Sequence, residues 1–385
     1  MNKISHFIWH TIILLMLPTK VNAAEPLPNK VPIFINGNIV GLESYNIDGY
    51  TYFRLRDIAE QVGFSVIWNE KNQQIEITSN TSDVKENIPI SPWEYQKMLG
   101  KGIDVDWSKT NKGIEFYNKK AVKDFKEAGV SHVRIRVSKD ANEELFQHLD
   151  TQINDCLEYG LIPVLAYQAD DLKNNPNENN IQKTIQWWKT VAEHYQQYSS
   201  LLSFDLVIEV TDELNKQPSI LNDLYEQTVK AIRKTNPYRI VMISPRLRSD
   251  PVYLSELKIP SQHNGYIMAE WHFYASGPSK TNERKIWTTG TLEEKKLIQD
   301  KIDFALAWQE STNIPTWVGA WMAGNYNDEN DYSIVEQIKF AKFVVERLEF
   351  ANIPFAVNAD TKFYQRETGL WIEEMYPLFE EIFKN

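Results

Sequence analysis

The stretch NKKAVKDFKEAGVSHVRIRV, residues 118–137, contains the repeating unit of this chain. Its first part, NKKAVKDFKEAG, is charged and amphipathic, as a surface helix would be, and its last part, SHVRIRV, is a short apolar run typical of a buried strand. Similar runs recur along the chain, separated by further helix-like stretches such as SIVEQIKFAKFVVERLEFA. Strands that alternate with helices in this way are expected to lie parallel, with the helices as crossover connections.

Eight such apolar runs follow one another from about residue 93 onward. They are GKGIDVDW (100–107), SHVRIRV (131–137), LIPVLAY (161–167), FDLVIEV (204–210), RIVMISP (239–245), GYIMAEWHFY (265–274), IPTWVGAW (314–321) and IPFAVNA (353–359). Eight strand–helix units in this length of chain predict an α/β fold, a closed (β/α)8 TIM barrel over residues 93–385.

The N-terminus predicts an exported protein. Lys3 precedes an apolar stretch at residues 7–17, and Val21-Asn22-Ala23 has the small residues of a cleavage site. We therefore expect a cleaved signal peptide at residues 1–23, with an uncleaved anchor as the lesser alternative, and no membrane span in the mature chain. A single cysteine, Cys156, rules out an intramolecular disulfide. This combination favours a bacterial protein that is secreted or held in the cell envelope.

Residues 31–78 predict a small α+β domain, and the polar residues 79–92 predict a linker. The segments INGN, DGYTYFRLRDIAEQVG and VIWNEKNQQIEI resemble the copper amine oxidase N-terminal-like stalk domain of bacterial envelope proteins. Residues 31–78 contain no His and no Cys, so a copper site is not expected there. The resemblance instead implies a spacer or a possible attachment to the cell envelope.

Composition and charge favour some classes of binding partner and argue against others. The formal net charge is −11 and no stripe of Lys and Arg stands out, which argues against nucleic acid. Acidic polysaccharides would be repelled on average, although a local basic patch could override that repulsion. No metal-binding spacing occurs, and neither a metal nor a cofactor is expected. The 12 Trp, 18 Tyr and 17 Phe suit a sugar-binding cleft, but they also suit large aromatic cores.

Polar side chains stand at the ends of the predicted strands, where a barrel of this kind carries its chemistry. Arg134 and Arg136 lie on the second strand, and an arginine inside a barrel must pair with a carboxylate. The other polar residues at strand ends are Asp104, Asp106, Tyr167, Gln168, Glu209, Asp212, Glu213, Glu270, His272, Tyr274, Asn358 and Asp360. Carboxylates with His, Arg and aromatic residues around one opening indicate glycoside chemistry, although these groups could also merely satisfy one another at the rim.

Residues 93–383 resemble glycoside hydrolase family 5, a cellulase-like family of retaining (β/α)8 barrels. KMLGKGIDVDW and KEAGVSHVRIRV resemble its first two strands, and LVIEVTDELN resembles its Phe-Glu-x-x-Asn-Glu-Pro signature. WHFY resembles its His-x-Tyr strand, and IPTWVGAW resembles the strand with the signature Val-Gly-Glu-Phe/Trp. IPFAVNADTKFYQRETGLW resembles the closing segment. The resemblance implies hydrolysis of O-glycosidic bonds in a β-linked polysaccharide or oligosaccharide.

The resemblance also implies roles for single residues. Glu213 takes the position of the acid/base, and Arg134, His272 and Tyr274 take positions that contact the nucleophile or the substrate. The sequence departs from the family at several positions: Asp212 replaces Asn, Leu214 replaces Pro, Tyr167-Gln168 replaces a His, Asn358 replaces Trp, and Ala320 replaces the nucleophile. Asp212, Asn358 and Trp321 are nevertheless expected to contact the sugar.

Two functions remain open because an alanine cannot form a glycosyl-enzyme. One is a divergent hydrolase in which Glu213 is the general acid and Glu270, or alternatively Glu209 or Asp360, replaces the missing carboxylate. Such an enzyme would invert the anomeric configuration. The other is a non-catalytic carbohydrate-binding barrel of the cell envelope. Four aromatic residues are candidate stacking platforms or equally members of the core: Trp271, Trp321, Tyr326 and Trp371.

Overall fold

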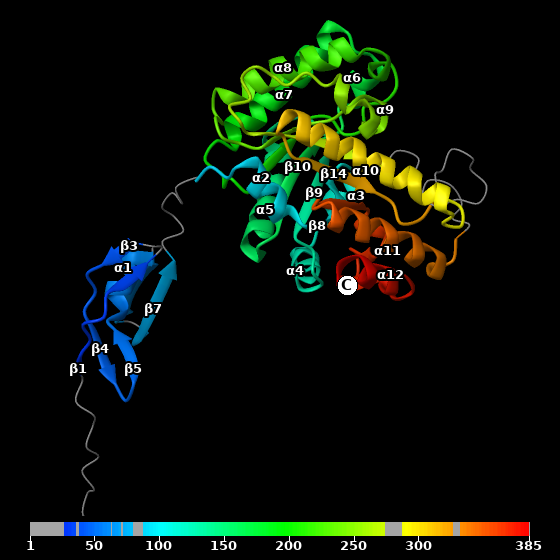
Figure 1. Ribbon diagram of the computed structural model, residues 1–385. Coiled ribbons are helices and arrows are strands. Elements are labelled where there is room, and N and C mark those ends of the chain that lie inside the picture. The colour runs from blue at the N-terminus through cyan, green and yellow to red at the C-terminus, as the bar shows by residue number, and fades with distance from the viewer. Residues whose placement is uncertain are drawn as a thin grey trace, which may run out of the picture. The chain divides into compact units, whose positions relative to one another are not determined.

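The computed structural model describes residues 27–35, 38–62, 64–70, 72–79, 88–273, 287–325 and 332–384. The chain divides into two compact units, Met1–Lys85 and Glu86–Asn385 (Figure 1). The predicted signal peptide at residues 1–23 lies outside the described residues, as do Asn36 and Gly37. Among the described residues, no helix combines the length and the apolar character needed to cross a bilayer.

The first unit contains seven short strands and one helix among its described residues. Three strands form an antiparallel sheet in the order β1-β4-β5, and two further pairs, β2-β3 and β6-β7, are antiparallel ribbons. The elements are β1 (Leu27–Pro28), β2 (Ile33–Ile35), β3 (Asn38–Val40), β4 (Ser44–Ile47), β5 (Tyr50–Phe53), α1 (Leu55–Val62), β6 (Phe64–Asn69) and β7 (Gln74–Ser79).

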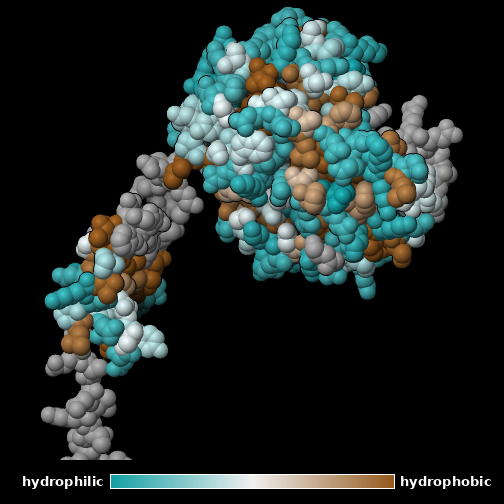
Figure 2. All heavy atoms as spheres, viewed as in Figure 1, coloured by the Kyte–Doolittle hydropathy of each residue, from teal (hydrophilic) through white to brown (hydrophobic). Residues whose placement is uncertain are grey.

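Large hydrophobic side chains are exposed on this first unit, and the aliphatic ones contribute to the brown spheres in Figure 2. Ala59 and Ser44 are its buried residues within the described part. The exposed residues are Leu27, Val31, Ile39, Tyr50, Tyr52, Leu55, Ile67, Trp68, Ile75 and Ile77. A unit of this size buries a smaller share of its surface than a large domain, and this one has few residues in its core.

The second unit is a closed barrel of eight parallel strands, as predicted (Figure 1). Its strands are β8 (Lys101–Ser108), β9 (His132–Val137), β10 (Ile162–Tyr167), β11 (Ser203–Asp205), β12 (Val241–Ile243), β13 (Ile267–His272), β14 (Thr316–Trp321) and β15 (Phe355–Asn358). The last strand pairs with the first, Asn358 opposite Asp104, so the sheet has no open edge. The fourth strand is much shorter than predicted, because the chain leaves the sheet after Asp205.

Helices surround this barrel. The α-helices are α2 (Pro92–Leu99), α3 (Asn111–Glu115), α4 (Lys119–Glu127), α5 (Glu143–Tyr159), α6 (Asp170–Asn174), α7 (Glu178–His194), α8 (Pro218–Arg233), α9 (Arg246–Ser249), α10 (Leu292–Thr312), α11 (Ile334–Phe350) and α12 (Tyr376–Phe383). Short 3-10 helices are η1 (Leu214–Lys216), η2 (Pro251–Glu256), η3 (Asp360–Lys362) and η4 (Glu373–Met375), and β16 (Tyr364–Gln365) pairs with β17 (Leu370–Trp371).

Helix α2 closes the N-terminal end of the barrel. Ser91 caps it by accepting a hydrogen bond from the Glu94 amide, and Pro92 begins it. Its buried Tyr95 and Leu99 join an inner cluster with Ile162, Val164, Ile240, Met242, Met268, Trp317 and Ala356. Since this end is filled by apolar side chains, the polar groups at the opposite, C-terminal ends of the strands form the mouth of the barrel.

Arg366 connects the first strand to the segment that follows the last strand. Its Nε and Nη2 each donate to the Asp360 carboxylate at 2.6 Å, and its Nη1 contacts Asp106 near the end of β8. Both Arg366 and Asp360 are buried. A bidentate pair of this geometry fixes both partners and therefore holds the seam of the barrel at its mouth.

Candidate functional site in the mouth of the barrel

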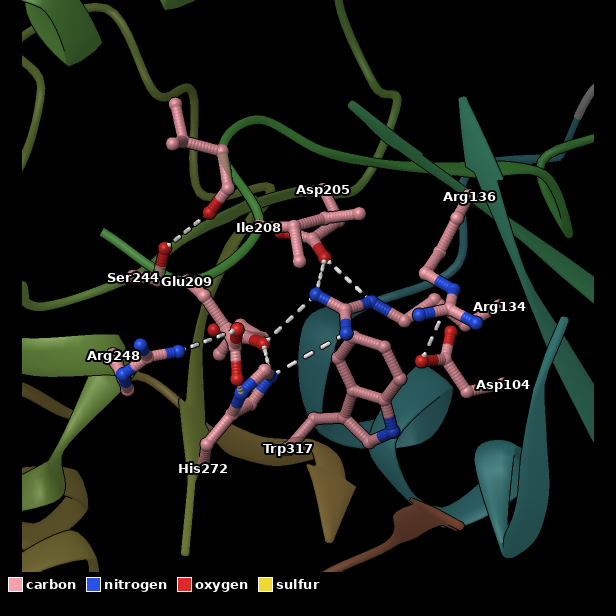
Figure 3. Close-up of polar contacts among 12 residues, drawn as sticks. Asp104, Arg134, Arg136, Asp205, Ile208, Glu209, Ser244, Arg248, His272 and Trp317 are labelled. Atoms are coloured by element: carbon pink, nitrogen blue, oxygen red, sulfur yellow. Dashed lines mark hydrogen bonds and ion pairs between the residues drawn. The ribbon is translucent and has the colours of Figure 1, made fainter. Parts of the chain in front are cut away.

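A cluster of charged side chains lies at the C-terminal ends of three strands (Figure 3). Its members come from β9, from the end of β11 and the loop after it, and from β13: Arg134, Asp205, Glu209, Glu270 and His272. All but Glu209 are buried. Since burying charges is costly unless they are paired, the arrangement depends on its internal contacts.

Arg134 is the centre of this cluster. Its Nε and Nη2 donate to Asp205 Oδ2 at 2.9 and 2.6 Å, and Nη2 also donates to Glu270 Oε1 at 3.0 Å. The guanidinium lies 5.6 Å from the centre of the Trp317 ring, which supports it from the barrel interior. The expectation that one arginine of this strand faces carboxylates is therefore met by Arg134.

His272 lies between two carboxylates. Its Nδ1 is 3.3 Å from Glu209 Oε1, and its Nε2 contacts Glu270 Oε1. Burial lowers the pKa of His272, but the charge of Glu270 and the hydrogen bonds that the ring donates to both carboxylates outweigh burial and raise that pKa to about 9. At neutral pH the ring is therefore an imidazolium that donates from both nitrogens.

Glu209 is the member of the cluster that reaches solvent, with 40% of its side chain exposed. Burial opposes its ionisation, but the hydrogen bond and charge of His272, with Arg248, lower the pKa of Glu209 to about 2. Arg248 Nη1 lies 3.5 Å from its carboxylate. Glu209 is therefore an ionised carboxylate at neutral pH, without a proton to give.

The loop that carries Glu209 is held in an unusual backbone conformation. Glu209 has φ 50°, a left-handed value that non-glycine residues rarely adopt. The Ile208 amide donates to the Tyr167 carbonyl at 3.0 Å, and the Arg248 amide donates to the Val210 carbonyl at 2.8 Å. Residues held in such conformations occur often at functional sites.

Glu270 and Asp205 are fully buried beneath this loop. Glu270 Oε2 and Asp205 Oδ1 accept no hydrogen bond from any described residue. Burial raises the pKa of Asp205 and the charge of Glu270 adds to this effect, although Arg134 opposes both. Two carboxylates thus share one guanidinium, an arrangement in which repulsion favours a proton on one of them.

Ala320 lies beside this cluster on β14, in register with His272 on β13. Its exposed fraction is 7%. The pairing of β14 with both neighbouring strands is irregular here, with register shifts after Trp271 and after Val318. Because the side chain of Ala320 is a methyl group, the tip of this strand adds no titratable group next to the cluster.

Two predicted site residues, Asp212 and Glu213, lie away from the cluster. Glu213 is 55% exposed and its Oε1 accepts from Lys216 at 2.6 Å, while Asp212 accepts from the Thr211 hydroxyl at 2.6 Å. The prediction extended strand four to residue 210, but the strand ends at Asp205. Both residues therefore fall on an exposed turn just before η1, whereas Glu209 contacts His272 at the mouth.

The predicted aromatic platforms belong to the core where the structure describes them. Trp321 is 3% exposed and packs against Phe340 and Phe355. Alternation from the inward-facing Trp317 would turn Trp321 inward, but the register shift in β14 turns it outward. Trp271 is also buried, and Trp371 packs against Phe379 on α12. Tyr274 and Tyr326 lie outside the described residues.

The remaining predicted residues lie near the seam. Asn358 ends β15 opposite Asp104 and is half-buried. Asp360 is held by Arg366 and is not free to act as a catalytic carboxylate. No group of three or more His, Cys, Asp or Glu side chains within the described ranges is arranged to hold a metal ion.

Sequence reasoning missed two members of the site, Asp205 and Arg248. Asp205 had a usable signal, because Phe204-Asp205 stands at the start of an apolar run just as Phe-Glu opens the family signature. Arg248 had none, since it comes from the separate segment Arg246–Ser249 and approaches Glu209 only through the fold.

Comparison with known proteins agrees with this fold and with the resemblance noted above. The family model described as Cellulase (glycosyl hydrolase family 5) matches residues 94–354. Endoglucanase H of Acetivibrio thermocellus is 26% identical over 263 residues, which cover 62% of this chain. The match covers 27% of that relative, so this chain spans only about a quarter of its length.

Solved structures have the same barrel. The endoglucanase Cel5A of the hyperthermophilic Thermotoga maritima superimposes with a TM-score of 0.65 at 22% identity, over 76% of this chain and 100% of that one. The clostridial cellulose synthase subunit Z of Clostridioides difficile superimposes with a TM-score of 0.61 at 21% identity, over 74% and 99% of the two chains. At these identities the likeness concerns the fold alone.

Proposed function

The chain belongs to glycosyl hydrolase family 5, the cellulase family, and from this premise we propose that it recognises a β-linked polysaccharide outside the cell, in the mouth of its barrel. We further propose that it does so without the two-step hydrolysis of a retaining glycosidase. Retaining hydrolysis needs two carboxyl groups on opposite sides of the scissile bond, one as nucleophile and one as acid/base. The proposal depends on whether the mouth of this barrel contains both of these carboxyl groups.

Ala320 is the observation that carries the proposal. By resemblance it occupies the nucleophile position, and it lies in register with His272 at the edge of the charged cluster. A methyl group cannot form a covalent glycosyl intermediate. Glu270 supplies a carboxylate nearby, but it is fully buried and paired with Arg134 and His272. We infer that Glu270 balances the charge of Arg134 and does not attack a sugar.

We assign the acid/base position to Glu209 in place of Glu213. If Phe204-Asp205 is matched to the Phe-Glu that opens the family signature, Ile208 and Glu209 fall where the signature has Asn-Glu. This assignment is supported by the contact of Glu209 with His272, which Glu213 lacks. Because its pKa is about 2, Glu209 cannot protonate a leaving group at neutral pH.

Inverting hydrolysis is the second candidate, and one observation favours it. Glu209 is an ionised and partly exposed carboxylate beside an alanine, so it has the charge state of a general base that activates water. The reaction would also need a protonated acid. Burial raises the pKa of Asp104, but this residue is buried and paired with Arg136, which weakens the case for it as the acid.

One experiment separates the two candidates. Cello-oligosaccharides of four to six sugars would be titrated calorimetrically into the wild type and into Glu209→Gln, and released reducing ends would be measured in parallel. Binding without release supports recognition alone. Release that is lost in Glu209→Gln, with inversion seen by NMR of the new anomer, would establish the second candidate. Glu213→Gln is the matched control and is expected to change neither quantity.

We also propose export through a signal peptide cut after Ala23, with residues 31–78 as a stalk-like module that attaches the barrel to the envelope. The support is the charged, apolar and small-residue order of residues 1–23 and the resemblance of the small unit. Intact-mass measurement of the chain recovered from a bacterial host tests the cut. A mature protein that retains residues 1–23 would contradict it.

A further inference from the structure

Two cationic side chains lie side by side on the rim of the mouth, at the ends of β8 and β9. Ser108 at the end of β8 pairs with Val137 at the end of β9, so Lys109 directly follows this pair and Arg136 directly precedes it. The Ser138 hydroxyl donates to the Lys109 carbonyl at 2.6 Å, which ties the two strand ends together.

Arg136 has a largely unused guanidinium. Its Nε lies 3.4 Å from Asp104 Oδ2 and makes no hydrogen bond, and 15% of its side chain is exposed (Figure 3). Among the residues that the structure describes, none accepts a hydrogen bond from its terminal nitrogens. A guanidinium presents parallel N–H donors that match a carboxylate, so this fork is available to a ligand.

Lys109 is half-buried, and its ammonium has no hydrogen bond or ion pair within the described ranges. Burial lowers the pKa of Lys109 and the charge of Arg136 lowers it further, whereas Asp104 and Asp170 oppose them. Arg136 is thus held close enough to Lys109 to oppose the ionisation of Lys109. An anion bound between them would offset that opposition.

Ion pairing among the described residues leaves Lys109 without a carboxylate partner. Asp104 offsets one of the two cations. Lys173, which follows β10, is offset by its own ion pair with Asp170 at 2.9 Å and donates to the Ile208 carbonyl. Asp106 and Asp360 share Arg366, which brings the charges at these strand ends close to balance, but within the described ranges Lys109 has no ion pair of its own. The net charge of the chain is −11. Long-range attraction cannot explain anion binding to such a chain, so binding must be local.

We propose that Lys109 and Arg136 bind the carboxylate of an acidic sugar, so that the β-linked polysaccharide recognised by this barrel carries uronic acid units. This inference rests on the proposed function and specifies its substrate class. Arg136 would clamp the planar carboxylate through its terminal nitrogens, and Lys109 would neutralise its charge.

The test compares two tetrasaccharides with the same β-1,4 backbone. One is cellotetraose, and the other is its C6-oxidised counterpart, a chain of four glucuronates. Calorimetry on the full-length protein is expected to give at least tenfold tighter binding of the oxidised chain. Lys109→Gln, which removes no hydrogen bond or ion pair of a described side chain, should reduce this preference severalfold. Arg136→Lys, which keeps the charge beside Asp104 but loses the fork, should also reduce it.

The control is a double variant that carries both Lys183→Gln and Lys234→Gln. It removes one exposed charge from helix α7 and one from the end of helix α8. It should leave the preference unchanged. Equal binding of both chains, or a preference that survives in Lys109→Gln and Arg136→Lys, would overturn the acidic-sugar inference alone. Failure of both tetrasaccharides to bind would overturn the proposed function and this inference with it.

Discussion

The carboxylate of Glu270 occupies the space beside Gly319 that any side chain at position 319 would need. An ideal Cβ built on Gly319 would lie 2.0 Å from Glu270 Oε1 and 2.7 Å from its Cγ. The glycine on β14 and the glutamate on β13 are therefore matched to each other. Because Glu270 is also held by Arg134 and His272, it cannot move aside without losing those partners.

Gly319→Ala should destabilise the barrel by about 1–3 kcal/mol, the usual cost of overpacking a core. Displacing Glu270 should also lower the pKa of His272. Urea unfolding and NMR titration of the His272 ring measure the two effects. Gly41→Ala is the control, since an added Cβ there meets nothing within 4 Å. Unchanged stability in the Gly319→Ala variant would show that Glu270 has another place to go.

Arg134→Met should be far more costly, at about 3–5 kcal/mol, because it leaves buried Asp205 without its cation and leaves Glu270 with His272 alone. Adding Asp205→Asn and Glu270→Gln to this variant should recover part of the loss, since the uncompensated charges are then gone. Denaturant midpoints for the single and triple variants provide the comparison. A triple variant less stable than Arg134→Met would contradict the charge argument.

The pair of His272 and Glu209 predicts a pH window for stability. The pKa of His272 rises from 6.5 to about 9 on folding, so its contribution is complete below pH 6.5 and is lost as pH rises towards 9. The pKa of Glu209 falls from 4.5 to about 2, so its contribution is complete above pH 4.5 and is lost as pH falls towards 2. The pair therefore stabilises the folded state most between about pH 4.5 and 6.5.

Glu209→Gln tests this window. The difference in unfolding free energy between wild type and variant should be largest between about pH 4.5 and 6.5 and should shrink on both sides. NMR should also show a lower pKa for His272 in the variant. A difference that does not change with pH would mean that the two residues are not coupled.

Ala320→Glu should introduce hydrolysis that retains the anomeric configuration, because it returns a carboxylate to the nucleophile position that we assign to Ala320. The negative charge of the new carboxylate should also raise the pKa of Glu209, which then holds the proton that the leaving group needs. The gain should increase when Glu270→Gln is added, since Arg134 is then free to pair with the new group. Release of reducing ends from cello-oligosaccharides measures both steps. Ala320→Gln, of the same size but without charge, should release none.

The barrel could be predicted because its signal is repeated eight times, and a few errors in strand length do not change the count. The site is less predictable, because it depends on where each single strand ends, and an error in one strand length misplaces the residues that follow it. FDLVIEV is mostly apolar, but the strand ends at Asp205, and Leu206, Val207, Ile208 and Val210 are buried in the loop that follows. Hydrophobicity reports burial and cannot tell these two apart. Because the prediction ran this strand to residue 210, it placed Glu213 at the mouth, whereas Glu209 contacts His272 there.

Side-chain direction at strand tips was equally hard to predict. Trp321 should face inward by simple alternation, but an irregular register in β14 reverses it. Arg134 and Glu270, which the sequence places on strands two and six, contact each other and lie where the pairing of β9 and β13 is regular. Pairings that depend on bulges or on distant loops, such as Arg248 with Glu209, leave no periodic trace in the sequence.

The bond network of Arg366 also has a consequence for synthesis of the chain. Strand β8 is made first in the barrel, but its second neighbour is β15, and Arg366 joins Asp106 to Asp360 only when the last segment is present. During translation, β8 therefore keeps one edge of unpaired amides and carbonyls until nearly the whole protein has left the ribosome. Chaperones or secretion machinery that cover this edge would determine the yield of folded protein.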